Sequence, residues 1–265
     1  MHECGLGLDP YRSLALDGVR GLSAHSRHRV ASVEAMSRPL LLDLFCGAGG
    51  AAMGYHRAGF DVVGVDIKPQ PHYPFQFFAG DALEFLASFG PPSRIYGFGA
   101  IHASPPCQRY SKSVSKKNRA NHPDLVAPAR ELLRVTGLPY IIENVPRAPL
   151  ENPIQLCGSA FGLPIQRHRL FETNFPLMSP GCAHGAYERK YPPAWNRTTP
   201  LRVLSISGGW TSDTGNSTLT VGLEEHKAAM GVDWEVTPHE LSEAIPPAYT
   251  QFIGEQLLEH LARVA

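Results

Sequence analysis

Residues 40–53 read Leu40-Leu-Leu-Asp-Leu-Phe-Cys-Gly-Ala-Gly-Gly-Ala-Ala-Met53, an apolar run followed by glycines and then by helix-favouring residues. The apolar run is broken only by Asp43 and predicts a buried strand, and the segment after the glycines predicts a helix that closes at Gly59. Gly47-x-Gly49-x-x-Ala52 fits the nucleotide-binding fingerprint, in which glycines let the backbone approach a ligand closely. Strand, glycine loop and helix in this order predict an α/β domain with a ligand site at the loop.

Two further predicted strands lead to acidic residues. The strand over 62–65 ends at Asp66, about twenty residues beyond the glycines, where an acid bonds ribose hydroxyls in nucleotide-binding sheets. The strand near 75–78 leads into Asp81. Asp81 lies either at the same edge of the sheet as a binding residue or at the start of a helix over 82–89 as its N-cap.

A cysteine follows another predicted strand, in the sequence Ser104-Pro-Pro-Cys-Gln108. Proline cannot donate to a sheet ladder, so the strand that includes Ala103 ends here and delivers Cys107 at its carboxyl end. Open α/β sheets bind ligands at that edge. Taken alone, Cys107 is equally well explained as a small buried residue.

The segment between Cys107 and His122 carries five cations and no carboxylate. Most runs of this kind are solvated surface loops. Beside a reactive cysteine, the alternative is that the cations neutralise phosphate groups next to the chemistry.

A carboxylate stands at the end of a further predicted strand. A helix over 124–136, capped by Asp124 and ended by Gly137, is followed by a strand over 140–142 and then by Glu143-Asn-Val-Pro146. Burying a carboxylate is costly unless it is paired or protonated. Glu143 is therefore either part of a surface turn or a functional acid.

Three motifs in this order resemble those of the DNA (cytosine-5) methyltransferases, especially the compact phage-type or solitary members. They are Phe45-Cys-Gly-Ala-Gly-Gly, Ser104-Pro-Pro-Cys-Gln and Glu143-Asn-Val. Arg167-His-Arg169 matches the Arg-x-Arg core of a further family motif. The last family motif falls at 241–254, where its usual Gly-Asn-Ser is absent. The resemblance covers most of the chain from about Arg38 onward.

The resemblance implies a fold, a cofactor and a reaction. The fold is a doubly wound, mostly parallel sheet of the Rossmann-like class I methyltransferases, and the cofactor is S-adenosyl-L-methionine. The implied catalytic residues are Cys107, Glu143, Arg167 and Arg169. The Cys107 thiolate adds to carbon 6 of a cytosine flipped out of duplex DNA, Glu143 stabilises charge at ring nitrogen 3, and the arginines hold the sugar-phosphate or the base carbonyl.

Two further sets of residues are carried over by position or by charge. The cofactor-binding set is Phe45, Gly47, Gly49, Asp66, Ile67, Asp81 and Pro105. The DNA-binding set is Gln108, Arg109, Lys112, Lys116, Lys117 and Arg119.

Four regions are expected along the chain. Residues 1–35 lack sustained periodicity and are expected to form a mobile N-terminal extension without function. Residues 36–172 form the catalytic and cofactor-binding domain. Residues 173–234, rich in Pro, Gly, Ser, Thr, Trp and Tyr, form a small target-recognition insertion. Residues 235–265 complete the catalytic domain, with a helix over 250–264 packing on the sheet.

Composition limits the class of protein. The chain has 265 residues, 43% of them apolar, which suits one sizeable globular domain. Its 24 basic and 24 acidic residues cancel, which argues against wholesale coating of nucleic acid. With no membrane-spanning or signal-like run, we expect a soluble, cytoplasmic monomer in a prokaryote or a phage-infected cell, with double-stranded DNA as partner and no obligate protein partner.

The cysteines predict neither disulfides nor a metal site. There are five, an odd number, and no Cys-x-x-Cys pair. Cys182 and His184 are close in sequence, but without a second pair of ligands they are expected to be ordinary loop residues, and no metal is predicted.

Three alternatives remain open. A nucleotide-binding dehydrogenase would explain the glycine loop and Asp66 but gives Cys107 and Glu143 no joint role. A non-catalytic DNA-binding relative has no need of those two residues. A tRNA cytosine-5 methyltransferase would share the same motifs, and the insertion does not exclude RNA. Reading of a target sequence is expected to depend on side chains of the insertion, residues 173–234, as in a restriction-modification methyltransferase.

Overall fold

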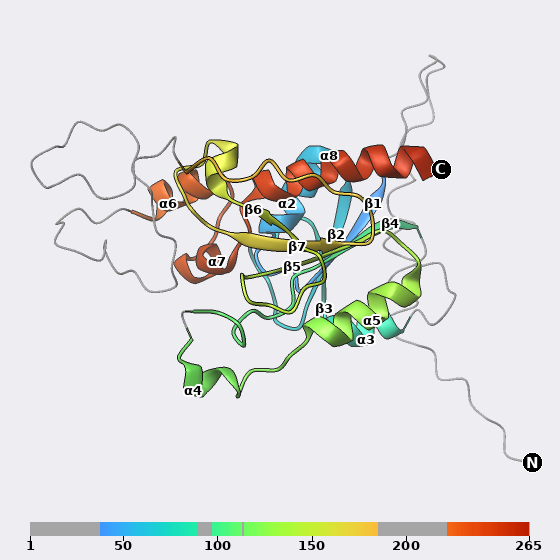
Figure 1. Cartoon of the computed structure of the whole chain (residues 1–265), viewed down its shortest axis with the longest axis horizontal. Helices are drawn as coiled ribbons and strands as arrows, with labels where there is room; N and C mark the ends of the chain where they lie inside the picture. The colour runs from blue at the N-terminus through green and yellow to red at the C-terminus, as the bar shows by residue number, and fades with distance from the viewer. Residues whose placement is uncertain (1–37, 89–96, 113, 185–221, 265) are drawn as a thin grey trace, which may run out of the picture.

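The computed structural model describes residues 38–88, 97–112, 114–184 and 222–264, and these contain one seven-stranded sheet of order β3-β2-β1-β4-β5-β7-β6 (Figure 1). The first five strands in chain order pair in parallel, β7 runs antiparallel to β5, and β6 runs antiparallel to β7. The prediction of a doubly wound, mostly parallel sheet is confirmed. The strands are β1 Leu40–Leu44, β2 Asp61–Asp66, β3 Gln76–Ala79, β4 Phe98–Ala103, β5 Tyr140–Asn144, β6 Ile154–Leu156 and β7 Arg169–Thr173.

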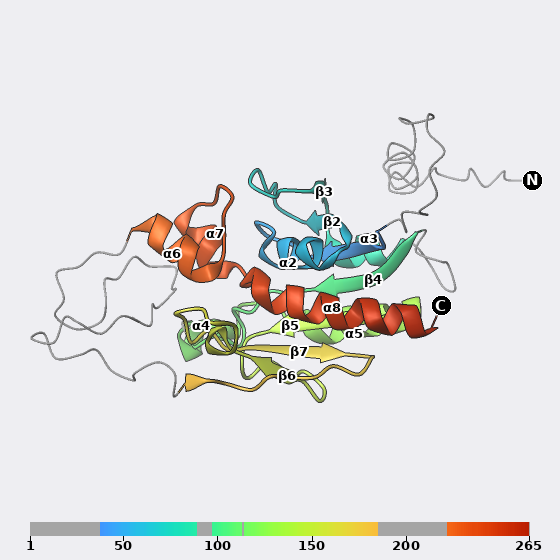
Figure 2. The ribbon, with the colours of Figure 1, turned by 90° about the horizontal axis from the view of Figure 1, so that it is seen from above.

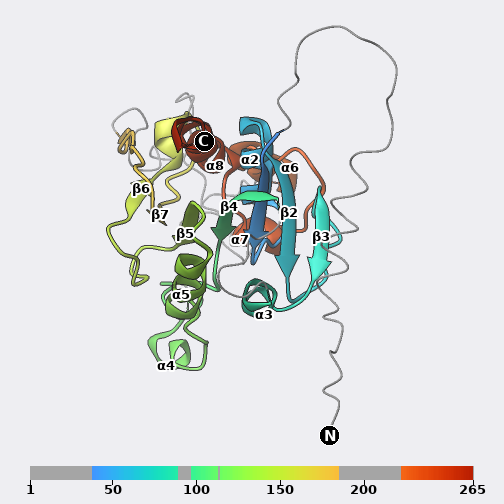
Figure 3. The same cartoon turned by 90° about the vertical axis from the view of Figure 1, so that its right-hand side faces the viewer.

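Helices cover both faces of the sheet. Helices α2 and α8 pack against each other on one face, and α3 and α5 lie on the other (Figures 1 and 3). Helices α4, α6 and α7 lie at one end of the sheet, away from the C-terminal end of α8 (Figure 2). The helices are α2 Gly50–Ala58, α3 Ala82–Ala87, α4 Lys116–Arg119, α5 Val126–Thr136, the 3-10 helix η1 Gly158–Phe161, α6 Leu223–Met230, α7 Pro238–Glu243 and α8 Pro247–Val264. None of these helices is both long and apolar enough to cross a membrane.

The core follows from the alternation of side chains along the central strands. Leu41 packs with the cluster under α2 and α8, whereas its neighbour Leu42 packs with the cluster under α3 and α5. Ile141 and Ile142 divide in the same way. A strand that is buried on both faces must be apolar at successive positions, which explains the unbroken apolar runs in the sequence.

Two predicted helix boundaries are wrong by two or three residues. Helix α5 begins at Val126 rather than at Asp124, and its N-cap position is Leu125. The Asp124 carboxylate still accepts a hydrogen bond from the Val126 amide, at 3.3 Å, so it bonds the first turn from outside the helix. Helix α8 begins at Pro247 rather than at residue 250, because proline fits the first turn of a helix, where its missing N–H is not needed.

The predicted regions can be compared with the structure only in part. Residues 1–35 and most of the predicted insertion, 185–221, lie outside the described residues. The end of that insertion packs on the glycine loop: Met230 and Val232 share an apolar cluster with Ala48, and the Trp234 indole donates to the Ala48 carbonyl at 3.0 Å. Residues 222–234 therefore contact the predicted cofactor loop directly.

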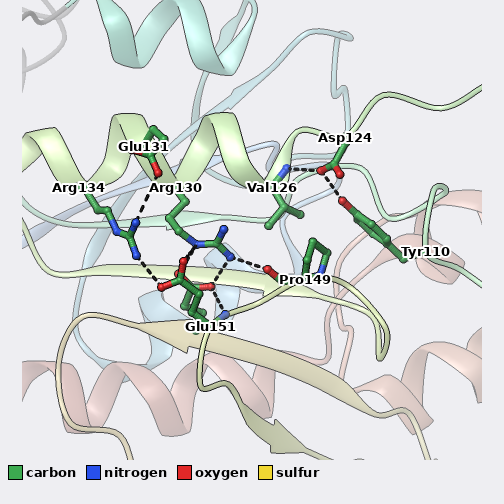
Figure 4. A network of polar contacts seen from close by, with 9 residues as sticks. Tyr110, Asp124, Val126, Arg130, Glu131, Arg134, Pro149 and Glu151 are labelled. Carbon is green, nitrogen blue, oxygen red and sulfur yellow. Dashed lines mark hydrogen bonds and ion pairs between the residues drawn. The ribbon is translucent and has the colours of Figure 1, made fainter. Parts of the chain in front are cut away.

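A buried ion pair joins α5 to β7. The Arg130 guanidinium donates from Nε and Nη2 to the two carboxylate oxygens of Glu172, both at 2.7 Å, and Nη2 also donates to the Pro149 carbonyl. The Glu151 amide donates to Glu172 as well, at 2.7 Å. Figure 4 shows this network and its extension through Glu151 to Arg134 near the surface. Because every charge has several partners, the pair fixes the helix on the sheet.

We expect Glu172→Ala to lower the free energy of unfolding by roughly 3–5 kcal/mol, because it removes the buried carboxylate that lies closest to the buried Arg130 charge. Arg134→Ala is the matched control: its side chain is 46% exposed and pairs with exposed carboxylates, so its loss should lower the free energy of unfolding far less than Glu172→Ala does. Urea denaturation measures both values. Equal losses in the two variants would show that the buried pair has no special importance.

A second buried carboxylate lies in β1. Asp43 is fully buried, and the Tyr73 hydroxyl donates to its Oδ2 at 3.4 Å. Its Oδ1 has no hydrogen-bond partner among the described residues. Burial raises the pKa of Asp43 to about 8, so the group is largely protonated at neutral pH. On the neighbouring strand β4, burial lowers the pKa of His102 to about 3, and His102 stays neutral between Tyr55 and Ser104.

The raised pKa of Asp43 makes folding depend on pH. The folded chain keeps the Asp43 proton in a range where the unfolded chain has lost it, so this stabilisation decreases as the pH rises from about 4 to 8. His102 acts in the opposite direction, but only below its unfolded pKa of 6.5. We expect the contribution of Asp43 to fall by roughly 1.5 kcal/mol between pH 6.5 and 8.

Asp43→Asn should remove this part of the pH dependence, because the amide mimics the neutral acid at every pH. Urea denaturation of the wild type and of Asp43→Asn across pH 6.5–8 gives the difference between their free energies of unfolding, and the change in that difference with pH measures the contribution of Asp43. A difference that stays constant over this range would contradict a protonated Asp43.

Candidate active site

The parallel register of three adjacent strands places the predicted motifs side by side. Leu44 of β1 pairs with Ala103 of β4, and Ala103 pairs with Ile142 of β5. Phe45, Ser104 and Glu143 are the next residues of these three segments, so they lie in one row at the carboxyl edge of the sheet. Motifs separated by about a hundred residues of sequence therefore meet at one place.

The loop that carries Cys107 is held by backbone and side-chain hydrogen bonds. Asn144, fully buried at the end of β5, donates from Nδ2 to the Pro105 carbonyl at 2.9 Å. The Cys107 carbonyl accepts from the amides of Tyr110 and Ser111, both at 2.9 Å. These contacts fix the backbone on each side of the thiol.

Glu143 is buried beside a cation. Arg169 Nε lies 3.1 Å from Glu143 Oε1, in an ion pair without the directional geometry of a hydrogen bond. Burial raises the pKa of Glu143, and the nearby charges of Arg169 and Arg167, together with a hydrogen bond from Ser104, oppose that rise. A carboxyl with a raised pKa exchanges a proton more readily near neutral pH than an exposed one.

The two arginines approach the site from the start of β7. Arg167 is held through its Nη2, which donates to the Ser242 carbonyl, and through its own carbonyl, which accepts from the Tyr249 hydroxyl. Burial and repulsion from Arg169 lower the pKa of Arg167 to about 9. Arg169 donates from Nη1 to the His168 carbonyl at 2.9 Å.

The structure thus brings the four predicted catalytic residues together. Burial raises the pKa of the Cys107 thiol; Glu143 and Glu243 add to the rise, whereas Arg169 and Arg167 oppose it. The thiol is therefore protonated at neutral pH in this state. The same charges decide how easily it becomes a thiolate.

Because Glu143 and Arg169 act on Cys107 with opposite sign, we expect opposite effects from removing each charge. Glu143→Gln should lower the pKa of the Cys107 thiol, and Arg169→Gln should raise it. The pH dependence of iodoacetamide alkylation, followed on the Cys107 peptide by mass spectrometry, measures both shifts without any substrate. The Cys107 peptide of urea-denatured protein, alkylated in parallel over the same pH range, is the reference. Shifts of the same sign in both variants would contradict this arrangement of charges.

The glycine loop presents an open backbone at the same edge. Phe45 and Gly47 both have positive φ, 57° and 50°, and a Cβ at Gly47 would meet nothing within 4 Å. A Cβ at Gly49 would lie 2.7 Å from Pro74, so only glycine fits there. The Asp66 carboxylate accepts from the Gly47 amide at 3.1 Å and thereby braces the loop.

The remaining predicted cofactor residues each come just after the end of a strand. Ile67 follows β2 and is 68% exposed, an unusual position for a large apolar side chain. Pro105 is buried in the loop after β4. Asp81 caps α3: its Oδ1 accepts from the amides of Leu83 and Glu84. The N-cap alternative for Asp81 is therefore confirmed, and a ligand-binding role for it stays a prediction.

Among the predicted DNA-binding residues, the arginines bond the loop itself and the lysines are exposed. Arg109 donates to the His122 carbonyl and Arg119 to the Val114 carbonyl, both at 3.0 Å, so these arginines stabilise the loop itself. The exposed side chains are those of Lys112, Lys116 and Lys117. Gln108 lies 3.5 Å from Glu243 and so contacts the end of α7.

Sequence reasoning missed two residues near the thiol. Asn144 holds the Cys107 loop, and its place beside Glu143 at a strand end was the available signal. Glu243 influences the thiol from α7, and nothing in the local sequence marks it.

The prediction that Cys182 and His184 have no second pair of metal ligands is wrong. Cys157 and His168 lie with them, and one potential ligand atom of each residue lies within 4.8 Å of all the others. The reason is strand pairing. In the antiparallel ladder Leu156 of β6 pairs with Arg169 of β7, so the residues just beyond, Cys157 and His168, face each other.

Comparisons with known proteins agree with this fold. No family model matches the chain. A 35-residue segment is 57% identical to the type II methyltransferase M.XorII of Xanthomonas oryzae pv. oryzae; it represents 13% of this chain and only 8% of that relative. The crystal structure of the S. pombe Dnmt2 methyltransferase is similar with a TM-score of 0.54 and 14% identity, and the match covers 84% of this chain and 99% of that one.

A second solved structure is similar to this chain over the same share of its length. The Entamoeba histolytica methyltransferase EhMeth matches with a TM-score of 0.50 and 13% identity, again over 84% of this chain and 99% of that chain. At this identity the structural likeness concerns the fold. The chain therefore has the fold of these methyltransferases.

Proposed function

We propose that this protein is an S-adenosyl-L-methionine-dependent methyltransferase that modifies carbon 5 of a cytosine in duplex DNA. One observation carries the proposal: Cys107, Glu143 and the two arginines meet at the carboxyl edge of the sheet and are coupled electrostatically. A dehydrogenase would use the glycine loop but not this group of four. A protein that only binds DNA would need neither the thiol nor the buried acid.

Cys107 acts as the nucleophile. Carbon 5 of cytosine is a poor nucleophile, but addition of a thiolate to carbon 6 turns carbon 5 into an enamine-like centre. The Cys107 proton must leave first, and the positive charges of Arg167 and Arg169 favour its loss. After transfer, loss of the proton at carbon 5 and release of the thiolate restore the aromatic ring.

Glu143 holds the proton that balances the charge on the ring. Addition at carbon 6 places negative charge on ring nitrogen 3, and a carboxyl at that nitrogen stabilises it by sharing a proton. Burial raises the pKa of Glu143, as this role needs. The charge of Arg169, whose Nε lies 3.1 Å away, prevents the pKa of Glu143 from rising further.

The glycine loop and the strand ends beside it fit the cofactor. The open backbone at Gly47 suits the methionine portion of the cofactor. The Asp66 carboxylate suits the ribose hydroxyls, and the exposed Ile67 side chain suits the face of the adenine ring. Phe45, Gly49, Asp81 and Pro105 complete the predicted set. When bound, S-adenosyl-L-methionine supplies an electrophilic methyl group.

Duplex DNA is the proposed partner. A base inside the stack cannot reach Cys107, so the cytosine must be flipped out. We assign phosphate contacts to Lys112, Lys116 and Lys117, which are exposed and follow Cys107 in the chain, and such contacts position DNA without reading its sequence. The same chemistry on tRNA cytosine is the closest alternative.

The decisive assay offers labelled cofactor with duplex DNA or with tRNA to the wild-type protein and to Cys107→Ser. We expect label in DNA with the wild type and at least a hundredfold less with the variant, because a hydroxyl is a far weaker nucleophile than a thiolate at neutral pH. Cofactor affinity, measured by calorimetry, should be similar for the two proteins and controls for misfolding.

Other outcomes of the assay are equally informative. Label in tRNA but not in DNA would keep the chemistry and change the substrate. Near-native transfer by the serine variant would contradict covalent catalysis through Cys107. Cofactor binding without transfer to either nucleic acid would contradict the proposed activity.

A further inference from the structure

Four side chains with metal-binding atoms meet on the side of the sheet formed by β6 and β7. Cys157 follows β6, His168 precedes β7, and Cys182 and His184 belong to the segment after β7. Cys157 Sγ lies 3.3 Å from His184 Nε2, and Cys182 Sγ lies 3.5 Å from His168 Nε2. One ligand atom from each residue lies within 4.8 Å of the other three.

The two thiol–imidazole distances match an edge of a tetrahedral zinc site. With Zn–S bonds of about 2.3 Å and Zn–N bonds of about 2.0–2.1 Å, a sulfur and a nitrogen ligand are separated by about 3.5–3.6 Å. The observed distances, from Cys157 Sγ to His184 Nε2 and from Cys182 Sγ to His168 Nε2, are within about 0.3 Å of this value. Two thiols and two imidazoles are also a donor set that structural zinc sites use, and the cluster includes no carboxylate that would favour calcium or magnesium.

The surroundings of the two sulfurs suit thiolate ligands. The Ser159 hydroxyl donates to Cys157 Sγ at 3.2 Å, and the Gln155 amide lies 3.7 Å from Cys182 Sγ. Ser159 is itself held, because its Oγ accepts from the Ala183 amide at 3.1 Å. Donors of this kind orient metal ligands and support their charge.

We propose that Cys157, His168, Cys182 and His184 bind a zinc ion in a structural site. Four protein ligands close the coordination sphere and leave no position for a substrate, so the ion serves the fold. Each cysteine releases its thiol proton on binding, and each histidine binds through neutral Nε2.

The position of the site lets the ion stabilise the backbone beside the candidate active site. His168 lies between Arg167 and Arg169, and its carbonyl accepts from Arg169, which pairs with Glu143. A metal bond to His168 therefore fixes the backbone that delivers both arginines. Cys182 and His184 lie in the first part of the predicted recognition insertion, 173–234, so the ion also anchors that part of the chain to the ends of β6 and β7.

The metal content of the purified full-length chain tests the site directly. The protein is prepared under reducing conditions without chelator, and bound zinc is counted by elemental mass spectrometry. We expect about one zinc per chain. Metal-free protein, made with a chelator and a thiol reductant, should take up one cobalt ion and show the visible absorption of tetrahedral cobalt with thiolate ligands.

Variants separate the cluster from other thiols and imidazoles. Cys182→Ser and His184→Ala remove the more accessible pair and should lower the bound zinc at least tenfold. Cys107→Ser and His239→Ala, which lie outside the cluster, should keep one zinc. Chelation should lower the melting temperature of the wild type but not of Cys182→Ser, a readout that needs no substrate.

Three results would overturn the proposal. One is reduced wild-type protein that binds neither zinc nor cobalt. Another is zinc content that Cys182→Ser and His184→Ala leave unchanged. The third is a Cys157–Cys182 disulfide, found by peptide mapping, that persists under the reducing conditions in which the metal is offered.

Discussion

The lateral register of β1, β4 and β5 is the constraint on which the candidate site depends. Leu44, Ala103 and Ile142 are paired across three parallel strands, so the residues that follow them leave the sheet at one edge. Asn144 then ties the end of β5 to the loop after β4 through the Pro105 carbonyl. A slip of one residue would turn Glu143 to the opposite face of the sheet and break the row.

Residues 168–172, in and just before the antiparallel strand β7, take part in three separate interactions. Arg169 at the start of the strand pairs with Glu143, and Glu172 near its end forms the buried pair with Arg130. His168, the residue before the strand, joins the proposed zinc site. The buried pair fixes β7 against α5, and the metal would fix its other end. The position of Arg169 near Cys107 therefore depends on contacts well outside the site.

Local patterns in the sequence were sufficient for the parallel sheet, the glycine loop and the convergence of Cys107 with Glu143. Each of these depends on a strand followed by a polar or glycine-rich end, and parallel strands bring such ends together. The cluster of Cys157, His168, Cys182 and His184 was not predictable, because Cys157 meets His168 only through antiparallel pairing across β6 and β7. Glu243 was missed for a similar reason, since tertiary packing of α7 brings it near the thiol. The predicted starts of helices α5 and α8 were wrong by two or three residues, because the residues that can begin or cap a helix fit several neighbouring positions.

The central claim, a covalent bond between Cys107 and the base, can be tested with duplex DNA that contains 5-fluorocytosine in place of cytosine. Fluorine cannot leave carbon 5 as a cation, so an adduct that has accepted a methyl group cannot resolve. In the presence of S-adenosyl-L-methionine, we expect a stable species with the summed mass of protein, DNA strand and methyl group, cross-linked at the Cys107 peptide. Methylation of ordinary duplex DNA without any adduct on the fluorinated duplex would contradict the account.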